Sequence, residues 1–179
     1  MKVLVVVDMQ NDFITGSLGT PEAQAIVPNV KKKIEHAREN GDLIIYTRDT
    51  HKDNYLTSRE GKKLPVEHCV KGTPGWEIAD GLVVDDGVVK NIINKKTFGS
   101  EKLVAMIVEA VSNENIEEVE LVGLCTDICV VSNALMLKAA LYETCEVSVD
   151  ASCCAGVTPQ SHEAALKTME MCQINVKRG

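Results

Sequence analysis

Apolar runs and amphipathic segments alternate along this chain. Apolar runs typical of buried strands occur at Val3–Val7, Asp42–Thr47, Val119–Gly123 and Val147–Asp150, with weaker runs near Gly87–Ile93 and Gln173–Val176. Apolar residues recur at helical spacing near Pro21–Asn40, Glu101–Ser112, Asp127–Tyr142 and Pro159–Met171. This alternation predicts an α/β fold in which helices cover both faces of a mostly parallel, roughly six-stranded sheet. We expect one three-layer αβα domain over residues 1–179.

Composition and charge exclude several classes of protein. Hydrophobic residues make up 45% of the chain and charged residues 25%, as in ordinary globular proteins. The net charge of −7 argues against nucleic acid as a partner, because phosphate binding needs a basic face. The apolar N-terminal run is too short for a signal peptide or a membrane span, so we expect a cytoplasmic protein. The seven cysteines lack zinc-finger spacing and are expected to be mostly reduced.

Cys129 lies between the apolar run that ends at Gly123 and the amphipathic segment that follows. A thiol in the first turn of a helix faces unpaired N–H groups and the positive end of the helix dipole. Both favour the thiolate, and the same N–H groups could stabilise the oxyanion of an acyl intermediate. The alternative is a small buried residue that starts a helix.

Asp8 directly follows the first apolar run, at the end of a predicted central strand. Ligands of open α/β sheets bind at such strand ends. A buried carboxylate there needs a cationic or proton-sharing partner, although Asp8 could also brace a loop. Lys95 and Lys96 precede a predicted helix, where they are either such a partner or a solvated pair.

The segment from residue 52 to 80 has little periodicity, and long loops in compact domains are usually functional. Asp49 and His51 share one side of an extended strand, since side chains alternate. Together with His68 they form a set that suits catalytic zinc, and also iron or manganese. Without a metal, Asp49 and His51 could make a local polar turn.

Five segments, taken together and in order, resemble the isochorismatase-like cysteine hydrolases, and most closely their nicotinamidase and pyrazinamidase branch. The segments are Val6–Phe13, Tyr46–His51, His68–Gly75, Lys95–Ser100 and Gly123–Val130, which span nearly the whole chain. The resemblance implies a cysteine amidohydrolase that acts on a small-molecule amide, most closely nicotinamide in NAD salvage. It also implies a homo-oligomer, a dimer or tetramer.

The resemblance assigns roles to the reactive residues. Cys129 is expected to be the nucleophile, Asp8 the proton carrier and Lys95 the residue that adjusts their pKa values, with Lys96 the rival if the register slips. The backbone N–H groups of Cys125 and Cys129 are expected to form the oxyanion hole. Asp49, His51 and His68 match metal ligands, and Glu60 matches a fourth ligand of some members.

The resemblance also describes the substrate pocket. We expect a cis Leu124–Cys125 peptide, and a pocket lined by Phe13, Leu64 and Leu124. Nicotinamidases often carry a tryptophan where this chain has Leu64. Either Leu64 forms an aliphatic wall, or Trp76 folds back to the pocket, or the substrate is not nicotinamide.

Two other classes of function remain open. One is another hydrolase of the same superfamily, which acts on isochorismate or on a carbamoyl or ureido compound. The other is a binding or thiol-redox protein without catalysis, although the adjacent Cys153 and Cys154 lack the spacing of a redox dithiol. The metal-ligand set and the Cys129, Asp8 and Lys95 set favour the amidase.

Overall fold

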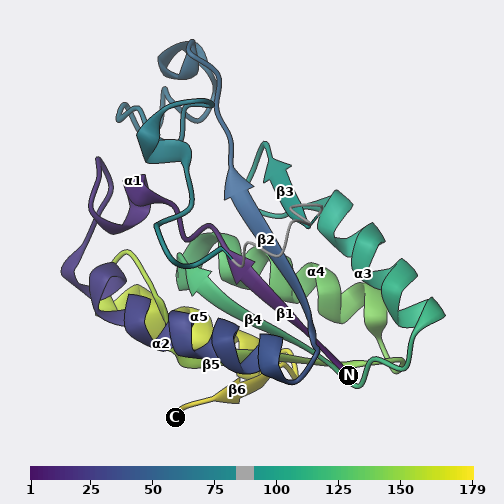
Figure 1. Ribbon diagram of the computed structural model, residues 1–179. Coiled ribbons are helices and arrows are strands. Elements are labelled where there is room, and N and C mark those ends of the chain that lie inside the picture. Colours follow the sequence, from purple (N-terminus) through teal and green to yellow (C-terminus); the bar gives the residue numbers. More distant parts are fainter. Residues whose placement is uncertain (84–90) are drawn as a thin grey trace.

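The computed structural model, which describes residues 1–83 and 91–179, contains one sheet of six parallel strands in the order β3-β2-β1-β4-β5-β6 (Figure 1). The strands are β1 (Lys2–Val7), β2 (Leu43–Asp49), β3 (Ile92–Lys95), β4 (Glu118–Leu124), β5 (Glu146–Ala155) and β6 (Asn175–Lys177). The α-helices are α1 (Asn11–Ile14), α2 (Pro21–Glu39), α3 (Glu101–Asn113), α4 (Val131–Leu141) and α5 (Pro159–Met171). The predicted α/β fold is confirmed.

Two apolar layers hold the helices on opposite faces of the sheet. On one face α2 buries Ile26, Val30 and Ile34 against Leu4 and Val6 of β1. On the other face α3, α4 and α5 pack against the alternate strand residues through a cluster that is almost wholly aliphatic. Figure 1 shows α2 in front of the sheet, with α3 and α4 behind it. The alternation of side chains along each strand therefore supplies both layers.

The register of the parallel strands brings the functional strand ends together. Asp49 at the end of β2 pairs with Lys95 at the end of β3. Val7 of β1 pairs with Gly123 of β4. A Cβ on Gly123 would lie 2.1 Å from the Val7 carbonyl oxygen, and its φ of +114° also requires glycine. Gly123 thus permits the close approach of β1 and β4 beside the site.

Several element boundaries differ from the predictions. β2 continues to Asp49 and β5 to Ala155, both further than the apolar runs indicated. The predicted weak strand near Gly87–Ile93 is represented by β3, and residues 87–90 lie outside the described part of the chain. The short helix α1 was not predicted. Among the described residues, no helix is both long and apolar enough to cross a membrane.

Candidate active site

The side chains of Asp8, Lys95 and Cys129 meet at the carboxyl ends of the strands; we call them the nucleophile group. Lys95 Nζ lies 2.6 Å from Asp8 Oδ2 and donates a hydrogen bond to Cys129 Sγ at 3.3 Å. All three residues are buried. The sheet thus unites residues that are separated by more than 80 positions between Asp8 and Lys95.

Asp8 occupies the first position after β1 with φ +46°, a left-handed conformation that is uncommon outside glycine. Its backbone N–H donates to the Thr47 carbonyl at 3.2 Å, and the Thr47 hydroxyl donates to Asp8 Oδ1 at 2.7 Å. Burial raises the pKa of Asp8, and the positive charge of Lys95 offsets this only in part. Asp8 is therefore a stronger base than an exposed carboxylate.

Lys95 connects the nucleophile group to β2. Besides Asp8 and Cys129, its ammonium donates to the Thr97 carbonyl at 3.2 Å and lies 3.7 Å from Asp49 Oδ1. Burial opposes the charge of Lys95, but the negative charges of Asp8 and its neighbours outweigh burial and raise its pKa. Lys96 is exposed and lies outside this group, so the structure places Lys95 rather than Lys96 beside the thiol.

Cys129 belongs to one turn of π-helix, Thr126–Val130, which leads into α4. The Leu124–Cys125 peptide that precedes this turn is cis, as expected. The start of a helix was expected to favour the thiolate, but burial and the charge of Asp8 raise the pKa of the Cys129 thiol well above its usual value. The Lys95 charge acts in the opposite direction but does not prevail. Burial therefore favours the neutral form of the Cys129 thiol.

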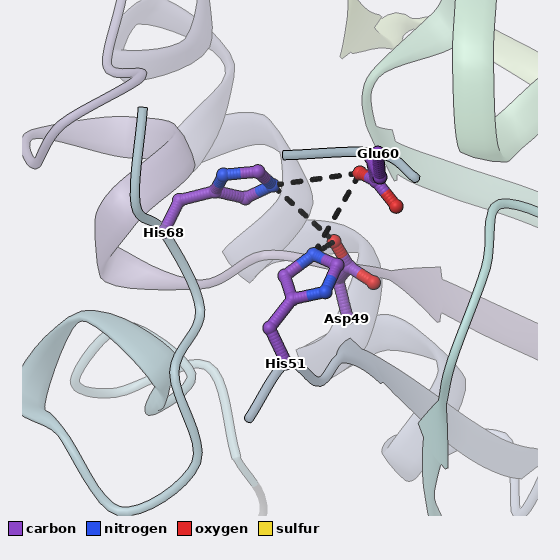
Figure 2. A group of neighbouring side chains, drawn as sticks. All are labelled: Asp49, His51, Glu60 and His68. Atoms are coloured by element: carbon purple, nitrogen blue, oxygen red, sulfur yellow. Dashed lines mark hydrogen bonds and ion pairs between the residues drawn. The ribbon is translucent and has the colours of Figure 1, made fainter. Parts of the chain in front are cut away.

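Asp49, His51, Glu60 and His68 form a second group, which we call the metal group (Figure 2). The Nε2 atoms of both imidazoles and one oxygen of each carboxylate point toward a common centre. Burial works against the charge of Asp49, but hydrogen bonds with His51 and His68 outweigh it and lower its pKa. The neighbouring Asp53 and Glu67 are exposed and take no part in the group.

The spacing of the metal group suits a small divalent ion such as zinc. Neighbouring ligands of a tetrahedral zinc ion lie about 3.4 Å apart, given bonds of about 2.1 Å. His51 Nε2 lies 3.0 Å from Asp49 Oδ2 and 3.7 Å from Glu60 Oε1. His68 Nε2 lies 3.6 Å and 3.9 Å from the same two atoms. His68 Nδ1–H donates to the Val66 carbonyl at 2.8 Å, which leaves the Nε2 lone pair for a metal.

A cavity of about 280 Å³ lies between the two groups. Asp49, Glu60, His68 and Cys129 lie on its wall together with the three expected pocket residues, Phe13, Leu64 and Leu124. Phe98, which is 41% exposed, also lines the cavity and was not among the expected pocket residues. Its position three residues after Lys95 was the available signal, because it lies in the loop that directly follows that residue.

Trp76 does not fold back to this cavity. Its indole N–H donates to the Thr50 hydroxyl at 2.9 Å, and the Arg48 guanidinium lies 3.6 Å from its ring centre. Trp76 is buried away from the residues that line the cavity. Of the three possibilities raised by the sequence, this one is excluded, and Leu64 supplies an aliphatic wall where Phe98 is an additional aromatic one.

Comparisons with known proteins identify relatives of this chain. A pyrazinamidase of Pyrococcus horikoshii, solved in complex with zinc, has 30% identity and a TM-score of 0.78 over 99% of each chain. A nicotinamidase of Saccharomyces cerevisiae is 29% identical over 80% of this chain and 84% of its own. A probable inactive nicotinamidase of Arabidopsis thaliana is 30% identical over 97% and 89%. The isochorismatase domain model matches residues 2–177. The chain therefore belongs to the isochorismatase family of hydrolases.

Proposed function

We propose that this protein is a metal-dependent cysteine amidase that hydrolyses nicotinamide to nicotinate and ammonia. One observation carries the proposal: Lys95 Nζ contacts Asp8, Cys129 and Asp49 at once. The nucleophile and the proton carrier thereby lie next to a set of metal-ligating side chains, on the wall of one small apolar cavity. The nicotinamidase and pyrazinamidase among the relatives support this substrate class.

In the first half of the reaction, Cys129 Sγ attacks the carboxamide carbon while Asp8 takes the thiol proton. Asp8 suits this step because burial has raised its pKa. The N–H groups of Cys125 and Cys129 hold the oxyanion of the tetrahedral intermediate. The C–N bond then breaks, Asp8 returns the proton to the departing nitrogen as ammonia forms, and a thioester remains on Cys129.

In the second half, water attacks the thioester carbon while Asp8 takes one of its protons. The C–S bond breaks, the carboxylic acid leaves, and the proton returns from Asp8 to Cys129. Throughout both halves the Lys95 ammonium, 2.6 Å from Asp8, compensates whichever negative charge is present. The nucleophile group thus ends the cycle as it began.

The metal group has a different task. Asp49, His51, His68 and Glu60 would hold a divalent ion, with zinc the best fit and manganese or iron as alternatives. The ion would supply a Lewis acid for the ring nitrogen of the substrate and so orient its amide. Phe13, Leu64 and Leu124 pack against the ring, together with Phe98. We further propose that the protein acts in the cytoplasm as a homo-oligomer.

Ammonia release from nicotinamide by the purified, zinc- or manganese-loaded protein tests this proposal. Cys129→Ala is expected to lower the rate by about 10⁴-fold or more. Cys154→Ala is the matched control, because Cys154 is an equally buried thiol outside the cavity. If the metal-loaded protein releases no ammonia from nicotinamide but does so from a carbamoyl or ureido compound, the substrate is wrong and the chemistry stands. Undiminished release by Cys129→Ala would contradict the mechanism.

A further inference from the structure

The side chain of Gln10 holds the backbone of one metal-group residue. Gln10 is fully buried just after β1. Its amide oxygen accepts from the Asp49 N–H at 2.7 Å, and its amide nitrogen donates to the Asp49 carbonyl at 2.9 Å. The same nitrogen donates to the Trp76 carbonyl at 2.8 Å. Gln10 therefore hydrogen-bonds both backbone groups of Asp49 and links them to the backbone of Trp76.

Two residues further on, Asp12 holds the residue next to His68. Asp12 Oδ2 accepts the backbone N–H of Cys69 at 2.7 Å. Cys69 has φ +47°, so this bond stabilises an unusual turn directly after His68. Gly75 leaves the room for it, since a Cβ there would come within 2.3 Å of the Asp12 carboxylate carbon. Asp12 thereby fixes the backbone of the residue that directly follows His68.

The remaining residues of this segment continue the pattern. Asn11 Nδ2 donates to the Pro74 carbonyl at 2.8 Å, which fixes the loop that faces Asp12. The ring centre of Phe13 lies 5.6 Å from that of His68. The four consecutive residues Gln10–Phe13 thus contact the end of β2, the residues around His68 and the loop at Pro74.

We propose that the segment Gln10–Phe13 is a template for the metal group, and that Gln10 and Asp12 are positioning residues that set its metal affinity. Gln10 fixes Asp49, and Asp12 fixes His68; Figure 2 shows these two ligands approaching the centre from different parts of the chain. His68 lies outside the named strands, and the backbone next to it is held by the Asp12 bond to Cys69 N–H and by the bridge between His51 and Val70. A ligand in such a loop needs rigid neighbours to fix its geometry. This inference rests on the metal dependence in the proposed function.

A matched residue exists on the other side of the site. Asn133 of α4 is fully buried, and its side chain also makes three hydrogen bonds with the backbone. It accepts from Ser100 N at 2.9 Å and donates to Phe98 O at 3.0 Å and to Cys129 O at 2.7 Å. Asn133 therefore supports the nucleophile side as Gln10 supports the metal side. Replacing Asn133 removes three hydrogen bonds of a buried side chain, as replacing Gln10 does, but none of them involves a residue of the metal group.

The test is the zinc dissociation constant of the metal-free protein, measured by competition with a chromophoric chelator. Gln10→Met and Asp12→Ala are expected to weaken zinc binding by about 10- to 100-fold, as for other outer residues of metal sites. Asp12→Asn keeps an oxygen that accepts from Cys69 N and is expected to restore wild-type affinity. Asn133→Leu is expected to lower the melting temperature as Gln10→Met does, with zinc affinity unchanged.

A second measurement keeps the test informative if Gln10→Met does not fold. In the metal-free protein, hydrogen exchange at the Cys69 amide should accelerate in Asp12→Ala but not in Asp12→Asn. Wild-type zinc affinity in Gln10→Met and Asp12→Ala would overturn the inference, as would an equal loss of affinity in Asn133→Leu. A wild-type protein that binds no zinc would instead show that the metal dependence in the proposed function is wrong.

Discussion

The two halves of the site are built by different means. Asp8 and Lys95 of the nucleophile group stand at strand ends, and Cys129 lies in the turn that leads into α4. The Lys95 ammonium contacts both of the other side chains directly. In the metal group only Asp49 belongs to a strand. The other three ligands come from loops, and hydrogen bonds from Gln10 and Asp12 hold the backbone around the group.

This difference indicates that the two groups can be perturbed separately, with Lys95 as their link. A side chain on a strand end needs few supports because the whole sheet fixes its position. A ligand on a loop depends on a small number of specific hydrogen bonds. Lys95 touches both groups, through Asp8 and Cys129 on one side and Asp49 on the other.

Removal of the Lys95 charge is expected to have the largest effect. Lys95→Met leaves the fully buried Asp8 without its cation, and breaking such a pair costs about 3–5 kcal/mol of unfolding free energy. Ammonia release should fall by about 10²-fold or more, because the pKa of Asp8 no longer suits the transfer of a proton to and from the thiol. Chemical denaturation and a coupled ammonia assay measure the two effects. Lys96→Met, one residue away and exposed, is expected to change neither.

The double variant Lys95→Met, Asp8→Asn sharpens this result. Since the asparagine side chain carries no charge, much of the stability lost in Lys95→Met should return, while activity stays absent. If Lys95→Met were as stable as the wild type, Asp8 and Lys95 would not form the buried ion pair described above.

Metal removal should affect one half of the site and spare the other. Chelation is expected to lower kcat/KM for nicotinamide by about 10²-fold, because the substrate loses its orientation. The rate at which iodoacetamide modifies Cys129 should change far less than kcat/KM, since the charge of the metal ligand Asp49 influences the thiol less than Asp8 and Lys95 do. Peptide mapping by mass spectrometry gives the rate. Equal changes in both readouts would mean that the two halves are not separable.

The thiol of Cys129 should become more reactive when its base is removed. At neutral pH the exposed Cys172 is expected to react with iodoacetamide before Cys129, and labelling of Cys129 should increase as pH rises, because its pKa is raised. The charge of Asp8 contributes to that increase in pKa, so Asp8→Asn should lower it and accelerate labelling by about tenfold. Turnover should nevertheless be lost. Slower labelling in Asp8→Asn would contradict the assigned electrostatics.

The smallest effect is expected at the cavity wall. Phe98→Ala removes an aromatic surface worth about 1 kcal/mol to a bound ring, so KM for nicotinamide should rise by about fivefold with kcat nearly unchanged. Leu56→Ala is the control, since Leu56 is a similarly exposed apolar residue outside the cavity. An unchanged KM in Phe98→Ala would mean that the substrate ring does not pack against Phe98.

The same contrast explains what the sequence could predict. Apolar runs mark strands, and a polar residue that ends such a run lies at the edge where parallel strands converge, so Asp8 and the Cys129 turn could be located. The sheet order and the pairing of Asp49 with Lys95 did not follow from the runs alone. His68 could be grouped with Asp49 and His51 by its ligand chemistry, but Glu60 could be named only through the family resemblance, because aperiodic sequence gives no geometry.

Two features of the site had no accessible signal in the sequence. The hydrogen bonds of Gln10 and Asp12 join residues 39 and 57 positions apart, and only the folded backbone shows which carbonyl or N–H lies opposite. The start of a helix predicted a tendency toward the thiolate at Cys129, whereas the burial and the Asp8 charge that the fold imposes raise its pKa. Local motifs predict which groups are present, whereas their protonation depends on the tertiary surroundings.

The most direct test of the account is the identity of the acylated residue during turnover. The metal-loaded protein would be mixed with excess nicotinamide, quenched in acid within the first turnover, and digested for mass spectrometry. The account predicts a nicotinoyl group on the peptide that contains Cys129, absent in Cys129→Ala. An acyl group on Cys125, or a burst of ammonia without any acylated cysteine, would contradict it.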